Sequence, residues 1–258
     1  MLGACGRRAG ANSPQAGAGR AIQNKGSDTI VNLALAWAEQ YRVEHPDISI
    51  AVTGGGSGTG IAALINGTVD IANASRAMKD DEIAKAEANG IEPQEHVIAI
   101  DALAVIVNPA NPVSELTIDQ LADIFTGRIS NWKDVGGLDE PIILVSRESN
   151  SGTHVYFLEE VVRTGDKEHK DVFARQTLLM PSSVGIPSEV KRNPHAIGYD
   201  GLGYVDPNTE KLIAVAKDAN SPYVLPSVAS GADGSYPIAR DLYMYTDKSP
   251  GQAITDYL

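Results

Sequence analysis

Three short turns, rich in glycine and in serine or threonine, each connect a predicted strand to a predicted helix. They are residues 26–29 (GSDT), 54–60 (GGGSGTG) and 147–153 (RESNSGT). A helix N-terminus presents unpaired backbone N–H groups and a partial positive charge, so it attracts anions. Glycines let the backbone approach an anion closely, and hydroxyl groups add donors. Three such turns in one chain, the last led by an arginine, predict a site for a small tetrahedral oxyanion.

The segments around the first two turns alternate between strand and helix patterns. The expected elements are strands at 21–25, 48–52 and 69–72, and helices at 30–41, 60–66 and 80–89. This order predicts a layered α/β domain with a largely parallel sheet. In such sheets, ligands bind beyond the carboxyl ends of the strands, where the helices begin.

A second α/β unit is predicted after a long apolar strand at 97–107, which Asp101 interrupts and which is a candidate for crossing between lobes. Thr117, with Gln120 three residues later, is predicted to cap a helix at 116–125. The other expected elements are a strand at 141–146, a helix at 151–162, segments at 172–180, 197–204 and 212–216 that complete the lobe, and a returning strand at 236–245.

The charge balance argues against a nucleic-acid partner. The 258 residues include 21 Lys and Arg against 33 Asp and Glu, and the net charge is -12. Nucleic acid is held by basic surfaces, and the sequence has no basic cluster. An anionic ligand would also meet a repulsive overall field, so its recognition must come from local hydrogen bonds and helix ends.

Neither a metal nor a cofactor is expected. The single cysteine, Cys5, excludes an internal disulfide and a multi-cysteine metal site. The five histidines (45, 96, 154, 169 and 195) have no ligand spacing, and no catalytic Ser/His/Asp set or paired carboxylates stand out. No run of residues is long and apolar enough to cross a bilayer.

Cys5 closes the sequence LGAC at positions 2–5, which resembles a bacterial lipobox. There the cysteine becomes the lipidated first residue of the mature protein. Residues 1–20 are then expected to be a flexible tether to the membrane. The charged and apolar regions that precede a lipobox are absent, which leaves a truncated start or a chance match as the explanations.

The glycine turn at 54–60 matches no standard phosphate or nucleophile motif. It lacks the G-x-G-x-x-G spacing of dinucleotide folds, the Gly-Lys of a P-loop and the last glycine of a G-x-S-x-G elbow. A plain strand-to-helix connection is the alternative to a ligand contact. In the same way, Ser151 and Asp28 could be helix N-caps and Arg147 could be a surface ion pair.

The chain resembles the phosphate-binding proteins of bacterial phosphate ABC importers, a periplasmic-type solute-binding family. The resemblance covers about residues 22–258 and rests on these stretches: 25–29 (KGSDT), 54–60, 70–76 (DIANASR), 116–153, 197–199 (IGY) and 203–205 (GYV). It implies a two-lobed fold in which each lobe is a mixed, mostly parallel sheet flanked by helices. Residues 21–100 and about 231–258 would form the first lobe, and residues 101–230 the second, with a hinge between them.

The resemblance implies that both lobes contact phosphate in the cleft. The candidate contacts are Ser27, Asp28, Thr29, Ser57, Ser75, Arg76, Arg147, Ser151, Gly152 and Thr153. Some relatives place an aspartate, which accepts the ligand's proton, where this chain has Arg76. We therefore expect Asp28 to accept that proton, while Ser75 and Arg76 donate. Relatives also continue through another helix where this chain ends at Leu258, so we expect the first lobe or the sequence to be incomplete there.

These observations predict a phosphate receptor rather than an enzyme, and the resemblance implies that it is a monomer. It would stand outside the cytoplasmic membrane, anchored only by lipid, and deliver inorganic phosphate to a membrane permease. A receptor for sulfate or molybdate is the first alternative, which the Asp28 carboxylate disfavours because those anions carry no proton to share. A phosphoester hydrolase is the second, and it would need an activated nucleophile or metals. An adhesive surface protein with a relic site is the third.

Overall fold

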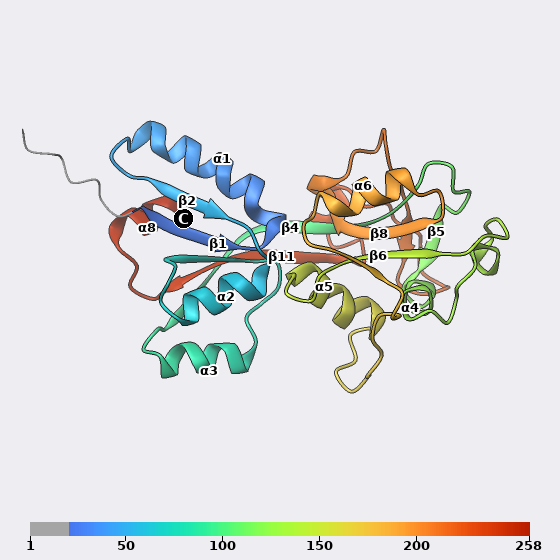
Figure 1. Ribbon diagram of the computed structural model, residues 1–258, viewed down its shortest axis with the longest axis horizontal. Coiled ribbons are helices and arrows are strands. Elements are labelled where there is room, and N and C mark those ends of the chain that lie inside the picture. Colours follow the sequence, from blue (N-terminus) through green and yellow to red (C-terminus); the bar gives the residue numbers. More distant parts are fainter. Residues whose placement is uncertain (1–20) are drawn as a thin grey trace, which may run out of the picture.

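A computed structural model describes residues 21–258 of the chain. It has two lobes that lie side by side, with strands β4 (Pro93–Val107) and β11 (Ala239–Asp247) running across the middle (Figure 1). The predicted tether at residues 1–20, with Cys5, lies outside the described residues. The α/β fold class expected from the sequence is confirmed.

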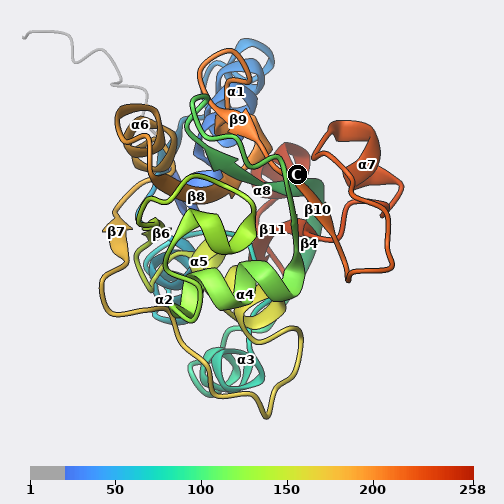
Figure 2. The same ribbon diagram turned by 90° about the vertical axis from the view of Figure 1, so that its right-hand side faces the viewer.

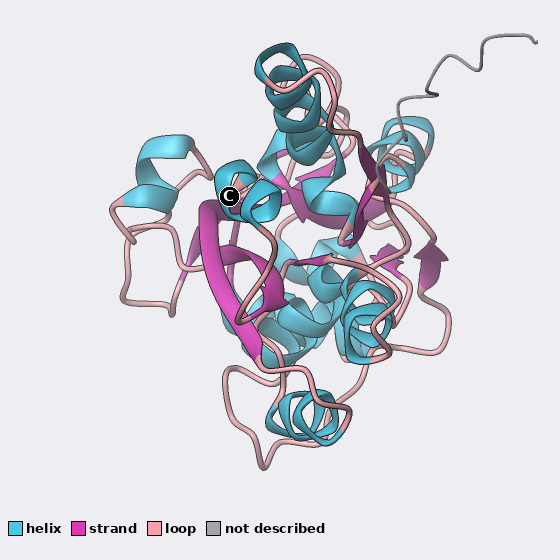
Figure 3. Cartoon of the chain, turned by 90° about the vertical axis from the view of Figure 1, so that its left-hand side faces the viewer, coloured by secondary structure: helices cyan, strands magenta, loops and turns pink. Residues whose placement is uncertain are grey.

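The first lobe has helices on both sides of its strands (Figure 3). Its elements are β1 (Ile22–Gly26), α1 (Asp28–Glu44), β2 (Ile50–Thr53), α2 (Ser57–Ile65), β3 (Ile71–Ala74), α3 (Asp80–Ala88) and α8 (Gln252–Tyr257). Helices α1 and α8 cover one face through a core that includes Ile30, Met244 and Tyr257. Helices α2 and α3 cover the other face, around Ile61 and Tyr245.

The second lobe repeats this layering (Figure 2). Its main elements are α4 (Ile118–Thr126), β6 (Ile143–Arg147), α5 (Gly152–Phe157), β7 (Leu178–Met180), α6 (Gly185–Arg192) and β8 (Ala196–Gly201). Shorter elements are β5 (Glu115–Thr117), β9 (Lys211–Leu212), β10 (Ala214–Ala216), α7 (Val228–Ala232), 3-10 turns at Trp132–Val135 and Leu202–Tyr204, and a π turn at Leu158–Val162. Its largest core cluster contains Phe125, Trp132, Phe157 and Tyr199.

One sheet passes through both lobes, with strand order β2-β1-β3-β11-β4-β8-β6-β7, and β9 pairs with β4. Strand β1 is parallel to β2 and β3, and β6 is parallel to β7 and β8. Strands β4 and β11 are antiparallel to each other and to their neighbours β8 and β3. The carboxyl ends of the two parallel groups therefore face each other across the junction of the lobes.

Several predicted elements have different bounds in the structure. The predicted cap of α4 is confirmed, since Thr117 and Gln120 form a capping box. Helix α2 begins three residues before the predicted start at position 60, because Gly56, with φ 87°, ends the turn. The predicted helix at 151–162 is an α-helix only as far as Phe157, beyond which the backbone forms the π turn. Helices α6, α7 and α8 were not predicted from the sequence.

Gly60 allows α2 to lie directly on β1. A Cβ atom at this position would lie 2.4 Å from the Lys25 carbonyl oxygen and 2.6 Å from the Gly26 Cα. Both contacts are with backbone, so the helix itself would have to move. We expect Gly60→Ala to lower the free energy of unfolding by about 1–3 kcal/mol, as overpacking does.

Denaturant unfolding of Gly60→Ala tests this, with Gly203→Ala as the matched control. A Cβ at Gly203 has no heavy atom within 4 Å, so the control should change stability by less than about 0.5 kcal/mol. Equal unfolding free energies for the two variants would show that α2 can shift without cost.

Candidate functional site

Three serine hydroxyls from the first lobe meet where β1 and β3 end and α2 begins. Ser27 Oγ donates to Ser75 Oγ over 3.0 Å, and Ser57 Oγ lies 3.2 Å from Ser75 Oγ. The Ser75 backbone N–H donates to Ser57 Oγ over 3.0 Å. All three residues are at most 2% exposed. Parallel strands bring their carboxyl ends to one edge, so residues that are 48 positions apart in the sequence form one buried hydroxyl cluster.

The start of α5 in the second lobe contacts this cluster. A Cβ atom at Gly152 would lie 2.3 Å from Ser57 Oγ and 2.6 Å from Ser75 Oγ, so any larger residue there would displace both hydroxyls. Next to it, the hydroxyl oxygens of Thr29 and Thr153 lie 3.1 Å apart. The two lobes therefore meet through polar groups.

Ser151 is the N-cap of α5, which is the role that the sequence offered as the alternative to a ligand contact. Its Oγ accepts a hydrogen bond from the Thr153 N–H over 3.2 Å. The hydroxyl is thus engaged in local structure, and its proton remains available to a neighbouring acceptor.

The glycines at 54–60 have a structural role of their own. The Gly58 N–H donates to the Asn150 carbonyl oxygen over 3.0 Å, and Asn150 Nδ2 donates to the Gly55 carbonyl oxygen over 3.0 Å. A Cβ at Gly56 would lie 2.7 Å from the Asn150 carbonyl oxygen. The glycine turn therefore allows the backbones of the two lobes to touch.

Arg147, at the end of β6, is held by several acceptors. Its Nη2 donates to Asp28 Oδ2 over 2.6 Å and to the Pro181 carbonyl oxygen over 3.2 Å. Its Nη1 donates to Ser183 Oγ over 2.6 Å, and its Nε donates to the Met180 carbonyl oxygen over 3.3 Å. The side chain is 1% exposed. This is a buried guanidinium with a fixed orientation rather than a surface ion pair.

Asp28 joins the two lobes from the first turn of α1. One carboxylate oxygen accepts from Arg147, and the other accepts from the Gly55 N–H over 3.1 Å. Its backbone carbonyl oxygen accepts from the Tyr204 hydroxyl, so the second lobe holds this residue at two points. A carboxylate is thereby held at the junction of the lobes, next to a cation.

Asp200, on β8, lies behind Arg147 and was not expected from the sequence. Its Oδ1 accepts from Ser183 Oγ over 3.1 Å and from the Gly201 N–H over 2.7 Å, and its Oδ2 lies 3.7 Å from Arg147 Nη1. Burial raises the pKa of Asp200 to about 6, and the Arg147 charge limits the rise. Its only signal in the sequence is an aspartate within an otherwise apolar strand.

Arg240, on β11, is a second buried arginine that was not expected. It donates to Asp101 Oδ2 from Nη2 over 2.9 Å, to the Ser75 carbonyl oxygen from Nη1 over 2.9 Å and to Thr153 Oγ1 from Nη2 over 2.9 Å. Burial raises the pKa of Asp101, while Arg240 opposes the rise. The interruption of the apolar run 97–107 by Asp101 was the signal for this pair.

Arg76 is the one candidate residue whose charged group lies apart from the others. Its Nη1 and Nη2 donate to the two carboxylate oxygens of Glu82, on α3, over 2.8 and 2.7 Å. Nη1 also donates to the Ala77 carbonyl oxygen over 2.8 Å. Its two terminal nitrogens are thus engaged, while the buried Nε has no hydrogen-bond partner, and a donor role for Arg76 stays a prediction.

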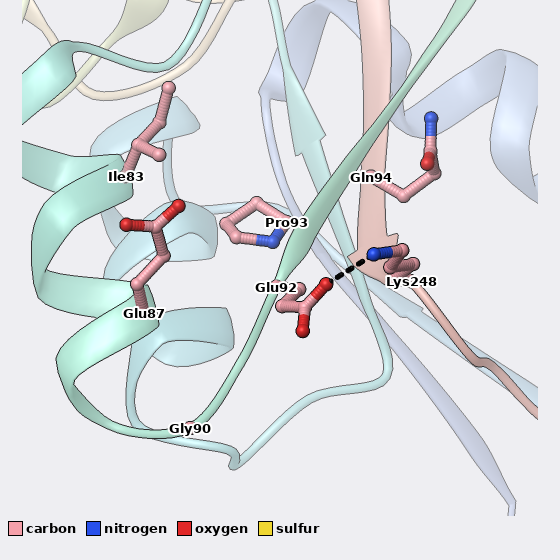
Figure 4. Close-up of a pocket in the computed structure, with 7 residues that line it drawn as sticks. All are labelled: Ile83, Glu87, Gly90, Glu92, Pro93, Gln94 and Lys248. Atoms are coloured by element: carbon pink, nitrogen blue, oxygen red, sulfur yellow. Dashed lines mark hydrogen bonds and ion pairs between the residues drawn. The ribbon is translucent and has the colours of Figure 1, made fainter.

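A pocket of about 570 Å³ lies away from the hydroxyl cluster, between α3 and the ends of β4 and β11 (Figure 4). It is lined by Ile83, Glu87, Gly90, Glu92, Pro93, Gln94 and Lys248. Its lysine forms an exposed ion pair with Glu92 over 2.6 Å.

Within residues 21–258, no three His, Cys, Asp or Glu side chains are grouped to hold a metal ion. Over the same residues, no helix has the length and apolar composition needed to cross a membrane.

A family model, the PBP superfamily domain, matches residues 12–258. Among curated proteins, the phosphate-binding protein PstS of Staphylococcus epidermidis is 35% identical over 254 residues, covering 96% of this chain and 76% of that protein. PstS of Pseudomonas aeruginosa is 33% identical over 246 residues, covering 90% of this chain and 74% of that protein.

A solved structure with the same fold is the candidate phosphate ABC transporter substrate-binding protein of Clostridium perfringens, which contains bound phosphate. It matches with a TM-score of 0.79 and 31% identity, covering 92% of this chain and 91% of that one. These similarities agree with the two-lobed α/β fold and with the resemblance found in the sequence.

The raised pKa of Asp200 predicts a pH dependence of stability. A typical aspartate in an unfolded chain has a pKa of about 3.9, so between about pH 4 and 6 the folded protein holds more protons than the unfolded one. The contribution of Asp200 to the unfolding free energy therefore falls as pH rises through this window, by at most about 1.4 kcal/mol per pH unit.

We expect the stability of the wild type relative to Asp200→Asn to decrease from about pH 4 to 6 and then level off. Denaturant unfolding at a series of pH values measures this. Asp47→Asn, at an exposed loop position, gives the effect of removing one exposed carboxylate. If the unfolding free energies of the wild type and Asp200→Asn changed with pH in parallel, Asp200 would not be protonated in the folded protein over this range.

Proposed function

Because the chain belongs to the PBP superfamily and to its phosphate-binding PstS proteins, we propose that it is a receptor for inorganic phosphate. The observation that supports this best is the meeting of three serine hydroxyls, the Thr29–Thr153 pair and the Asp28–Arg147 ion pair at one junction between the lobes. These groups supply donors, a fixed cation and an acceptor within one buried region.

The chemistry of this set suits an anion that carries a proton. Hydroxyl protons and the guanidinium donate to anionic oxygens. A carboxylate only accepts, so Asp28 can bind an oxygen that bears hydrogen. Phosphate has such an oxygen at neutral pH, whereas sulfate and molybdate do not. The proposed selectivity for phosphate therefore comes from Asp28, through repulsion of fully deprotonated anions.

Binding, rather than catalysis, is the proposed role. Among the described residues, the hydroxyl groups of Ser27, Ser57 and Ser75 contact one another and make no hydrogen bond to a histidine. A nucleophilic serine needs an adjacent general base. Phosphate would instead bridge the lobes and shift the open–closed equilibrium toward the closed form, which the permease would recognise.

The setting of the receptor is proposed from the sequence and the family. Residues 21–100 with about 231–258, and residues 101–230, would move as two lobes about β4 and β11. A monomer outside the cytoplasmic membrane, anchored only through a lipidated Cys5, would deliver phosphate to the permease of an ABC transporter. Mass spectrometry of the protein from bacterial membranes would identify a lipid on Cys5.

Calorimetric titration of the phosphate-stripped protein near pH 7 tests the function. We expect one-to-one binding of phosphate and no heat with sulfate or molybdate. Turnover of a phosphoester with divalent metals, in place of phosphate binding, would support the hydrolase alternative. Binding of sulfate would keep an oxyanion receptor but refute the role of Asp28.

We expect Asp28→Asn to reduce phosphate affinity by about tenfold or more and to reduce the preference for phosphate over sulfate. The variant loses a charge-assisted hydrogen bond and gains an amide N–H that can donate to a deprotonated anion. Titrations of both anions measure this, with Asp47→Asn as the exposed control that removes the same charge. Unchanged affinity and selectivity in Asp28→Asn would rule out its role as proton acceptor.

We expect Gly152→Ala to reduce phosphate affinity by more than about tenfold, because the new methyl group would occupy the space of two hydroxyls that should donate to the anion. Gly203→Ala is again the matched control. Wild-type affinity in Gly152→Ala would show that the Ser57 and Ser75 hydroxyls do not bind phosphate.

A further inference from the structure

Arg240 lies on a strand that both lobes share. Strand β11 runs across the centre of the molecule beside β4 (Figure 1), and Arg240 is the direct antiparallel partner of Asp101. The arginine side chain is 2% exposed, and both its Nε and Nη2 donate to Asp101 Oδ2, over 3.3 and 2.9 Å. The Tyr156 ring, from α5, lies 5.5 Å from the guanidinium carbon. These contacts leave Arg240 little freedom to move.

The same guanidinium contacts the candidate site in both lobes. Nη1 donates to the Ser75 carbonyl oxygen, at the end of β3, and Nη2 donates to Thr153 Oγ1, at the start of α5. It hydrogen-bonds none of the three serine hydroxyls. Arg240 is therefore placed behind the groups that would touch an anion.

The hydrogen bond to Thr153 determines where the threonine proton points. A guanidinium has donors and no acceptor, so Thr153 Oγ1 must accept from Arg240. The Thr153 hydroxyl proton is then directed away from Arg240, and its other neighbour is Thr29 Oγ1, 3.1 Å away. A hydroxyl that accepts from a cation is also polarised, which strengthens it as a donor.

We propose that Arg240, held by Asp101, is a positioning residue for phosphate binding. It orients and polarises the Thr153 hydroxyl as a donor to the anion, and it ties the Ser75 turn to the same guanidinium. This inference rests on the proposed phosphate-receptor function. The Asp101 carboxylate compensates the Arg240 charge, so the effect acts through Thr153 rather than through long-range attraction.

A double-mutant cycle tests the proposal. The first change is the pair Asp101→Asn with Arg240→Met, which avoids leaving one buried charge without its partner. The second change is Thr153→Val, which removes the hydroxyl and keeps a similar shape. Phosphate affinity is measured by calorimetry for the wild type, each change and their combination, and thermal unfolding confirms that each protein is folded.

We expect removal of the pair to weaken phosphate binding by about tenfold in the presence of Thr153, and by less than about twofold once Thr153 is valine. We also expect Arg240→Lys to retain part of the affinity, because an ammonium can still donate to Thr153. Asp123→Asn with Arg128→Met is the control, since it removes an exposed Asp–Arg pair on the second lobe and should leave affinity unchanged.

Equal losses of affinity with and without the Thr153 hydroxyl, or no loss at all, would overturn the proposal while leaving the phosphate receptor intact. A wild type that binds no phosphate would instead refute the proposed function, and this inference with it. If the paired variant does not fold, the same cycle is run with Arg240→Lys, for which equal losses in the two backgrounds again overturn the proposal.

Discussion

The antiparallel pairing of β4 with β11 is the interaction on which the arrangement of both lobes depends. These two strands occupy the middle of the sheet, with a parallel group on either side. Their direction makes the carboxyl ends of the two groups face each other, and helix N-termini and polar turns gather at such ends. The register shift between Leu242 and Tyr243 lies where the shared strands continue into the first lobe. A bulge of this kind bends a strand and increases its twist locally.

The junction between the lobes buries charge at a considerable cost in desolvation, which only pairing can offset. Arg147 is paired with Asp28 in front and lies near Asp200 behind, while Arg240 is paired with Asp101. Neither arginine could be buried alone. Each pair also fixes the direction of hydrogen bonds, because guanidinium groups only donate and carboxylates only accept. The buried arginines therefore fix the hydrogen-bond direction at the two hydroxyls that they contact, those of Ser183 and Thr153.

The sequence predicted those parts of the molecule that local pattern encodes. The strand–turn–helix order predicted the α/β fold, and the spacing of Thr117 and Gln120 predicted a capping box that the structure contains. The groups behind the site could not be predicted, because Arg240 and Thr153 are 87 residues apart and meet only through the sheet. The glycine turn at 54–60 shows that a sequence pattern can also have a second role that the pattern does not reveal. Its glycines looked like a means of approaching a ligand, but they also bring the backbones of the two lobes into contact.

The way in which a two-lobed receptor signals depends on the balance between two kinds of contact: those that the lobes make with each other and those that they make with the ligand. A ligand shifts the equilibrium between two states only by its difference in affinity for them. The Asp28–Arg147 pair and the Asn150 contacts join the lobes directly, so in the proposed closure they would act alongside the contacts of phosphate. If these contacts were much stronger, the closed form would predominate in the absence of phosphate and would carry no information for a permease. Buried hydroxyls that bond one another and could donate to an anion instead would suit the proposed closure on phosphate.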